Sequence, residues 1–252
     1  MIPLKDNIPT NRFPFVTVAL IVANVVVYLL AIRHGGSLIS GPDTYESVKY
    51  GAIPKALTNC LTQNLVVEPQ GVACTNASPA GALPTWVTVF TSMFMHGSIL
   101  HIAGNMLFLW IFGNNVEDSM GPIKYILFYL LGGIAALALQ VAIHPNEVAP
   151  TLGASGAIAA VLGGYIVLYP RARVLTLIFI ILFFTVVELP AIVVLGFWFA
   201  TQIAFGAAGL TSPGASGGVA YFAHIGGFVF GLATIRLLAT RRRQVPPRYP
   251  VY

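Results

Sequence analysis

Charged side chains are scarce in this sequence. They make up 8% of its 252 residues, whereas a soluble domain carries roughly 25%. Hydrophobic residues make up 57%, and the uncharged stretches reach about 20 residues, which is the length that crosses a bilayer. The shortage of charge excludes a soluble globule and predicts an integral membrane protein with several spanning helices.

The positive net charge does not indicate a nucleic-acid-binding protein. The charge is +5, but the basic residues lie beside apolar segments and do not form one solvated stripe. We therefore expect no nucleic-acid partner and interpret the basic residues as topology signals.

Cysteine is also rare, with only Cys60 and Cys74 in the chain. No other Cys or His lies close to them in sequence, which argues against a zinc site. Both fall in a long loop, residues 34–84, that the topology below places in an oxidising compartment. A disulfide between them is therefore predicted, since it would stabilise so long a loop. Two free thiols are the alternative.

Six apolar segments predict an all-α polytopic membrane protein, a bundle of six transmembrane helices without a separate large domain. The first segment is long for a signal peptide and is expected to be retained. The expected organisation is a cytoplasmic N-terminus (1–12), a membrane domain (13–238) with an outer loop (34–84), and a basic cytoplasmic tail (239–252). The predicted spans are residues 13–32, 100–116, 125–144, 155–169, the later part of 174–205, and 221–238.

The segment 174–205 is too long for one simple span. Glu188 and Pro190 interrupt it, and Pro favours the start of a helix. The fifth span is therefore expected to begin at Pro190, after an apolar connection at the membrane interface. A seven-span protein is the alternative.

The Lys and Arg residues predict the orientation, because cytoplasmic loops carry an excess of them. With six spans both termini share one side, and a cytoplasmic assignment for that side puts ten basic residues inside and three outside. We expect a multi-pass protein of the plasma (inner) membrane with both termini in the cytoplasm. The inside residues are Lys5, Arg12, Lys124, Arg171, Arg173, Arg236, Arg241, Arg242, Arg243 and Arg248, and the outside residues are Arg33, Lys49 and Lys55.

Polar side chains in or beside spans are costly and are therefore functional candidates. Three of the five histidines are placed in this way: His96, His101 and His224. His101 and Asn105 are four residues apart, so they share one helix face. The alternative is that such groups only form hydrogen bonds between helices.

Ser155 lies between glycines at the expected start of the fourth span. A helix N-terminus offers free N–H groups and a positive dipole end, which suits a nucleophile. The alternative is an ordinary N-cap serine. The same Gly-Ala-Ser-Gly sequence recurs around Ser216, and Ala157 breaks the Gly-x-Ser-x-Gly pattern of soluble hydrolases. The tetrapeptide alone therefore does not identify the site.

Small residues at four-residue spacing predict that the fourth and sixth spans pack closely. The topology puts Ser155, His224, His101 and Asn105 in the outer halves of their spans, at one depth. The fourth span measures about 22 Å at 1.5 Å per residue, less than the roughly 30 Å hydrocarbon core, so we expect a recessed pocket open to the outside. The two stripes are Gly156, Ala160, Gly164 and Ala223, Gly227, Gly231.

Together these residues resemble the rhomboid family of intramembrane serine proteases. The resemblance covers nearly the whole six-span core, residues 3–238, and Glu117 also lies where the family tends to carry a glutamate. Ala159 departs from the pattern, because the family often has a bulky residue there against the histidine. The three signatures, in family order, are His96-x4-His101-x3-Asn105, Gly153-x-Ser155-Gly156 and Ala223-His224-x2-Gly227-x3-Gly231.

The resemblance implies a serine endopeptidase that cleaves single-span membrane proteins in or near their helix. Ser155 would be the nucleophile, His224 its general base, and His101, Asn105 and the Ser155 N–H the oxyanion hole. His96 would be structural. The expected partners are transmembrane helices and lipid, with no cofactor and no metal, and the sequence sets no oligomeric state.

Two other functions stay open. One is a catalytically silent rhomboid-like protein that binds membrane helices, although such a protein usually lacks the Ser or the His. The other is a metal site or transporter built on His96, His101 and His224. The metal site would leave Ser155 and Asn105 without a role, and no HExxH pattern is present.

Overall fold

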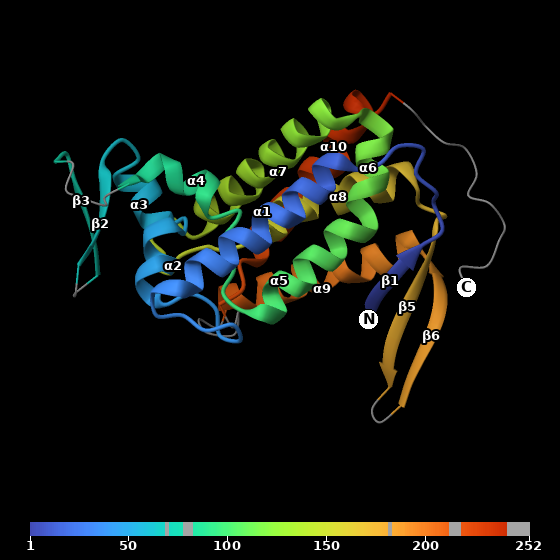
Figure 1. Cartoon of the computed structure of the whole chain (residues 1–252), viewed down its shortest axis with the longest axis horizontal. Coiled ribbons are helices and arrows are strands. Elements are labelled where there is room, and N and C mark those ends of the chain that lie inside the picture. The colour runs from blue at the N-terminus through green and yellow to red at the C-terminus, as the bar shows by residue number, and fades with distance from the viewer. Residues whose placement is uncertain (69–70, 78–82, 181–182, 212–217, 241–252) are drawn as a thin grey trace.

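The computed structural model describes residues 1–68, 71–77, 83–180, 183–211 and 218–240. Long helices run side by side in one bundle, and a small three-stranded sheet lies at each end of it (Figure 1). The described part of the chain is thus the predicted helical membrane bundle with two small sheets that the sequence analysis did not contain.

Within the described ranges, five helices are long and apolar enough to cross a membrane: α1 with its 3-10 extension, α5 to α6, α7, α9 and α10. The sixth apolar helix, α8, has 14 residues and measures about 21 Å. A protein with several spans is thereby confirmed, and a count of six stays a prediction. The bounds are α1 Phe15–Ala31, α5 Ile99–Phe108, a π-helical turn Leu109–Gly113, α6 Asn114–Met120, α7 Pro122–Ile143, α8 Ser155–Leu168, α9 Ala191–Thr211 and α10 Tyr221–Leu238.

Helix α8 lies at the centre of the bundle, with every residue from Gly156 to Tyr165 buried. The small residues on it and on α10 explain this position. A β-carbon on Gly227 would overlap the carbonyl oxygen of Gly156, and one on Gly231 would overlap that of Ala160. The predicted contact between the two small-residue stripes is confirmed, and it brings the two backbones together without side chains between them.

The sequence predicted an apolar connection before Pro190 without assigning it a secondary structure, and its place at the membrane interface stays a prediction. Strands β5 (Arg173–Ile180) and β6 (Phe183–Pro190) form an antiparallel hairpin, and β1 (Ile2–Asp6) pairs with β5. Val174 and Thr176 are buried, whereas Phe183 and Phe184 are exposed. Such β-branched and aromatic residues favour strands. The described residues of this segment are extended, so they hold no seventh helical span.

Buried carboxyl groups hold the N-terminal segment on the bundle. Asp6 accepts hydrogen bonds from the amide of Asn115 at 2.7 Å and from the Tyr165 hydroxyl at 2.5 Å. Burial raises the pKa of Asp6 to about 7. Glu117, which is 4% exposed, accepts from the backbone N–H of Val16 and from both N–H and hydroxyl of Thr17. It therefore caps the first turn of α1 from a distant part of the chain.

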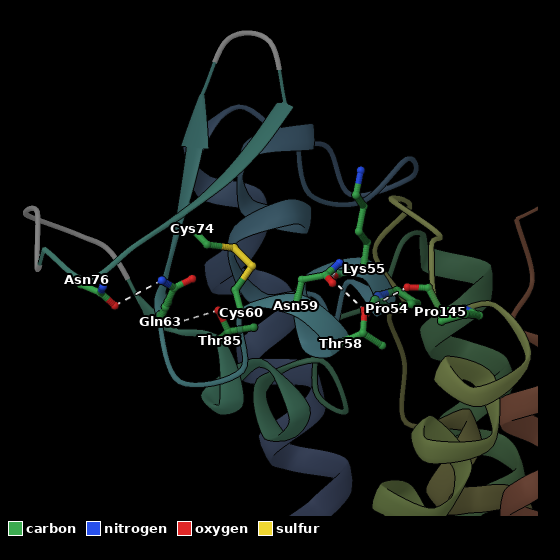
Figure 2. Close-up of a disulfide and its surroundings, with 10 residues drawn as sticks. All are labelled: Pro54, Lys55, Thr58, Asn59, Cys60, Gln63, Cys74, Asn76, Thr85 and Pro145. Atoms are coloured by element: carbon green, nitrogen blue, oxygen red, sulfur yellow. Dashed lines mark hydrogen bonds between the residues drawn. A yellow bond between two sulfur atoms is a disulfide. The ribbon is translucent and has the colours of Figure 1, made fainter.

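The long loop over residues 34–84 is folded. It contains α2 (Thr44–Tyr50), α3 (Pro54–Asn59) and a sheet of β2 (Asn64–Glu68), β3 (Gly71–Thr75) and β4 (Leu83–Pro84), followed by η2 (Thr85–Val87) and α4 (Thr88–Thr91). Figure 2 shows the predicted disulfide between Cys60 and Cys74, with Cα atoms 6.0 Å apart. It links the residue that follows α3 to strand β3, so that β2 lies within the closed loop.

This folded loop is tied to the segment that leads into α8. The Thr58 hydroxyl donates to the carbonyl of Pro145 at 3.1 Å (Figure 2). Ala52 and Thr151 exchange backbone hydrogen bonds at 3.1 and 2.8 Å. The loop over residues 34–84 therefore supports the chain just before Ser155.

Candidate active site

Ser155 and His224 are hydrogen-bonded. The Ser155 hydroxyl oxygen, at the first residue of α8, lies 2.8 Å from Nε2 of His224 on the first turn of α10. The close approach of α8 and α10 at Gly156 and Gly227 sets this distance. A serine–histidine contact of this length allows the proton of the hydroxyl to pass to the imidazole.

Ser155 is not an ordinary N-cap. Ala154 occupies the cap position, and the Ser155 hydroxyl contacts Nε2 of His224. Gly153 precedes them with φ of 122°, a backbone conformation that favours glycine. The turn therefore leaves the serine hydroxyl free to contact His224 at a helix start, where backbone N–H groups and the positive dipole end lie.

His101 lies beside Ser155, across Gly153. A β-carbon on Gly153 would lie 2.7 Å from Nε2 of His101 and 3.5 Å from the Ser155 hydroxyl oxygen. Helix α5, which carries His101, begins after Ser98, whose side chain accepts the His101 backbone N–H at 3.2 Å. A side chain at position 153 would therefore crowd the His101 imidazole, and the positive φ of Gly153 also favours glycine.

Asn105 lies one turn further along α5 and is 9% exposed. Its side-chain N–H₂ group is buried and has no hydrogen-bond partner among the described residues. A buried donor without a partner is costly. Asn105 lines the same pocket as Ser155, so a molecule bound in that pocket could supply the missing partner.

All four predicted site residues line one pocket. Its volume is about 1300 Å³, and Ser155, His224, His101 and Asn105 contribute to its wall together with Gly153. The loop before α8 and the chain before α10 line it as well. The structure thus places these four residues around one pocket. Their chemical roles are a separate question.

His96 lies behind His101. It is fully buried, its Nδ1 is 3.2 Å from the carbonyl of Phe94, and its ring packs edge-on against that of His101 at 5.1 Å. Burial, and then the nearby His101, lower the pKa of His96 to about 3. His96 is therefore neutral near pH 7 and supports the His101 ring. Among the residues with assigned positions, no three His, Cys, Asp or Glu gather as a metal site.

The sequence analysis missed two residues around His224, both on α9. Trp198 lies with its ring centroid 5.7 Å from the imidazole, and Gln202 has its side-chain oxygen 2.8 Å from Nδ1 of His224. Ala159 instead lies against α10 near Gly227. The bulky side chain that packs against His224 is therefore Trp198 and not residue 159. The Tyr221 ring also lies edge-on to the imidazole, at 6.3 Å. The sequence feature that could have pointed to α9 is the polar pair Thr201 and Gln202 within an otherwise apolar span.

The second Gly-Ala-Ser-Gly sequence, with Ser216, lies outside the described residues, as does the tail from residue 241 onward. The comparison of the two serines therefore depends on Ser155 alone. Ser155 has the histidine partner, the helix start and the pocket.

The fold and the pocket together define a polytopic helical membrane protein with a serine–histidine pair inside its bundle. The family model described as the Rhomboid domain matches residues 84–241. The chain belongs to the rhomboid family. The matched region includes all four site residues, whereas the Cys60–Cys74 disulfide precedes it.

Curated relatives agree with this assignment. The chain is 31% identical over 153 residues to Rhomboid protein 1, mitochondrial, of Saccharomyces cerevisiae, covering 58% of this chain and 40% of that protein. It is 33% identical over 94 residues to the mouse Presenilin-associated rhomboid-like protein, mitochondrial, covering 36% and 25%. Against Rhomboid-like protein 11, chloroplastic, of Arabidopsis thaliana, it is 36% identical over 75 residues, covering 30% and 26%. The chain therefore spans less than half the length of these relatives.

Proposed function

We propose that this protein is an intramembrane serine endopeptidase that cleaves single-span membrane proteins within or near their transmembrane helix. The observation that carries the proposal is the 2.8 Å contact between the Ser155 hydroxyl and Nε2 of His224 inside a pocket of the bundle. Membership of the rhomboid family supports the same reaction class.

In this proposal, the oxygen of Ser155 attacks the carbonyl carbon of the scissile peptide bond. Nε2 of His224 takes the hydroxyl proton and then gives it to the leaving amine as the C–N bond breaks. A water molecule, deprotonated by His224, then hydrolyses the acyl-serine ester. No carboxylate takes part, which suits a bilayer setting where a buried charge is costly.

The negative charge of the tetrahedral intermediate needs donors. Nε2 of His101 beside Gly153, the unpartnered amide of Asn105 and the Ser155 backbone N–H are the proposed oxyanion hole. Such donors are each worth roughly 3 kcal/mol when they meet charge that appears only in the transition state. The large pocket gives a substrate backbone and water access to these groups.

We also propose that the protein lies in the plasma (inner) membrane with residues 1–12 and 239–252 in the cytoplasm and residues 34–84 outside. The distribution of Lys and Arg supports this orientation, and the Cys60–Cys74 disulfide suits an oxidising compartment. The organelle names of the relatives describe those proteins.

A fluorophosphonate probe on the purified protein in detergent tests the serine assignment. Labelling should map to Ser155, be lost in Ser155→Ala and His224→Ala, and persist in Ser216→Ala and in EDTA. Labelling that survives Ser155→Ala, or that maps to Ser216, would refute the assignment. Loss of activity in EDTA would favour the histidine metal site, and a wild-type protein that neither labels nor cleaves would favour a helix-binding protein.

A further inference from the structure

A buried glutamine, Gln202, contacts the nitrogen of His224 that faces away from Ser155. Gln202 is 7% exposed on the apolar helix α9, and its side-chain oxygen lies 2.8 Å from Nδ1 of His224. Nε2 of the same imidazole contacts Ser155. One ring therefore joins the serine to a buried amide, and a buried polar side chain in a span calls for a function.

The orientation of the Gln202 amide follows from its other contacts. Its nitrogen donates to the carbonyl oxygen of Trp198 at 3.2 Å and to the hydroxyl of Thr201 at 3.0 Å. A carbonyl oxygen can only accept. The amide nitrogen must therefore face Trp198, which leaves the amide oxygen facing His224.

This orientation fixes the tautomer of His224. An amide oxygen only accepts, so Nδ1 of the imidazole must carry the hydrogen that it donates to Gln202. In a neutral ring the other nitrogen, Nε2, is then free of hydrogen. That nitrogen is the one 2.8 Å from the Ser155 hydroxyl, and it can accept the serine proton.

We propose that Gln202 is a positioning residue that holds His224 in the Nδ1–H tautomer and aims Nε2 at Ser155. This inference rests on the proposed peptidase function and adds a residue to it. The same bond persists when His224 becomes protonated, because the Nδ1–H remains. A neutral amide thus orients the histidine without placing a charge inside the bundle.

One turn of α9 supplies the whole arrangement. Trp198 and Gln202 are four residues apart and share a helix face. The indole packs on the imidazole while the backbone carbonyl of Trp198 holds the amide. The position of α9 and the geometry of the histidine are thereby coupled.

Substitution of Gln202 separates positioning from simple packing. In a lipid-reconstituted cleavage assay, Gln202→Leu should lower kcat by about 10-fold or more and leave KM within about 2-fold of wild type. Without Gln202, His224 can carry its hydrogen on Nε2, and that nitrogen then cannot accept the serine proton. Substrate binding should not change. Loss of a charged orienting group costs about 10⁴ in other serine proteases, and a neutral one should cost less. Gln202→Glu, which retains an acceptor for Nδ1, should recover most of kcat.

Asn24 of α1 provides a matched control, since it is another buried amide side chain, 0% exposed, in a long span and outside the pocket. Asn24→Leu should leave kcat within about 2-fold of wild type. The positioning role would be overturned if Gln202→Leu matched wild type, or if Leu and Glu at position 202 lowered kcat equally.

A second measurement does not require turnover. ¹⁵N spectra of histidine-labelled Ser155→Ala protein, with His224→Ala used for assignment, should show His224 protonated at Nδ1. Adding Gln202→Leu should shift the population toward protonation at Nε2. An Nε2–H tautomer in the presence of Gln202 would overturn the inference even if the protein cleaves, whereas an Nδ1–H tautomer in a protein that cleaves nothing would reject only the peptidase function.

Discussion

Ser155 and His224 lie 69 residues apart in the sequence, and 2.8 Å separates the serine oxygen from Nε2 of the histidine. Neither residue belongs to a continuous motif with the other. Their contact depends on two helices, α8 and α10, whose backbones touch through glycines just below the site. The chemistry proposed for the pocket therefore depends on how closely these helices pack.

Gly227→Ala should damage both folding and activity. The new β-carbon would overlap the carbonyl oxygen of Gly156, so α10 must move away from α8 and carry His224 with it. Overpacking of this kind typically costs about 1–3 kcal/mol. Thermal unfolding in detergent should show a lower midpoint, with at least about 10-fold slower labelling of Ser155.

Gly196→Ala on α9 is the control for that variant. A β-carbon at Gly196 meets no atom of the described structure within 4 Å, so its midpoint and labelling should equal those of wild type. Equal behaviour of Gly227→Ala and Gly196→Ala would show that the α8–α10 contact does not position the pair.

The proposed oxyanion donors predict a loss of rate without a loss of fold. His101→Ala and Asn105→Ala should each lower kcat by roughly 10²-fold, as for single oxyanion-hole donors in other proteases. Both groups border the pocket, so the unfolding midpoint should change little. A variant with wild-type turnover would exclude its residue from the oxyanion hole.

Glu117→Ala should destabilise the protein through α1. Its carboxylate accepts three hydrogen bonds from Val16 and Thr17 at 2.7–3.0 Å, and the variant leaves these donors buried without partners. A loss of about 1–3 kcal/mol is expected, measured as a lower unfolding midpoint. Asp118→Ala is the control, because its bonds to Asn11 are exposed and should be worth less than about 1 kcal/mol.

Asp6 predicts how stability depends on pH. Burial raises its pKa from 3.8 to about 7 in the folded state, so the folded state binds more protons than the unfolded state between these values. Its contribution to stability is complete below about pH 4 and is lost as pH rises through 7. The loss is at most about 4 kcal/mol, at 1.36 kcal/mol per pKa unit.

Unfolding midpoints at pH 4.5 and 7.5 measure this dependence. The wild-type midpoint should be lower at pH 7.5, and Asp6→Asn, which cannot ionise, should show a smaller difference between the two. An equal pH dependence in wild type and Asp6→Asn would mean that Asp6 titrates normally.

The sequence predicted most of the bundle because its signals are local. Apolar runs located five spanning helices within a few residues, and the last, Tyr221–Leu238, matched at both ends. The stripes containing Gly156 and Gly227 identified the pair of helices that approach closely. The pairing of those two helices, together with the family resemblance, led to the prediction that Ser155 and His224 share one site.

Other features depend on information that a local pattern does not carry. The apolar residues 174–190 suit an interfacial segment as well as a strand pair, and only the pairing with β1 distinguishes them. Gln202 was missed because the face of α9 that meets His224 is set by packing across the bundle. Apolar residues lie on every side of α9, so the sequence does not indicate which face of the helix points into the bundle.

Cleavage of a defined substrate tests the central claim most directly. Purified protein in liposomes, mixed with a panel of single-span membrane proteins, should produce fragments whose new termini, mapped by mass spectrometry, lie within or near the transmembrane helix. The Ser155→Ala protein, prepared in parallel, should produce none. Cleavage by the Ser155→Ala protein, or intact substrates throughout the panel with the wild-type protein, would contradict the account.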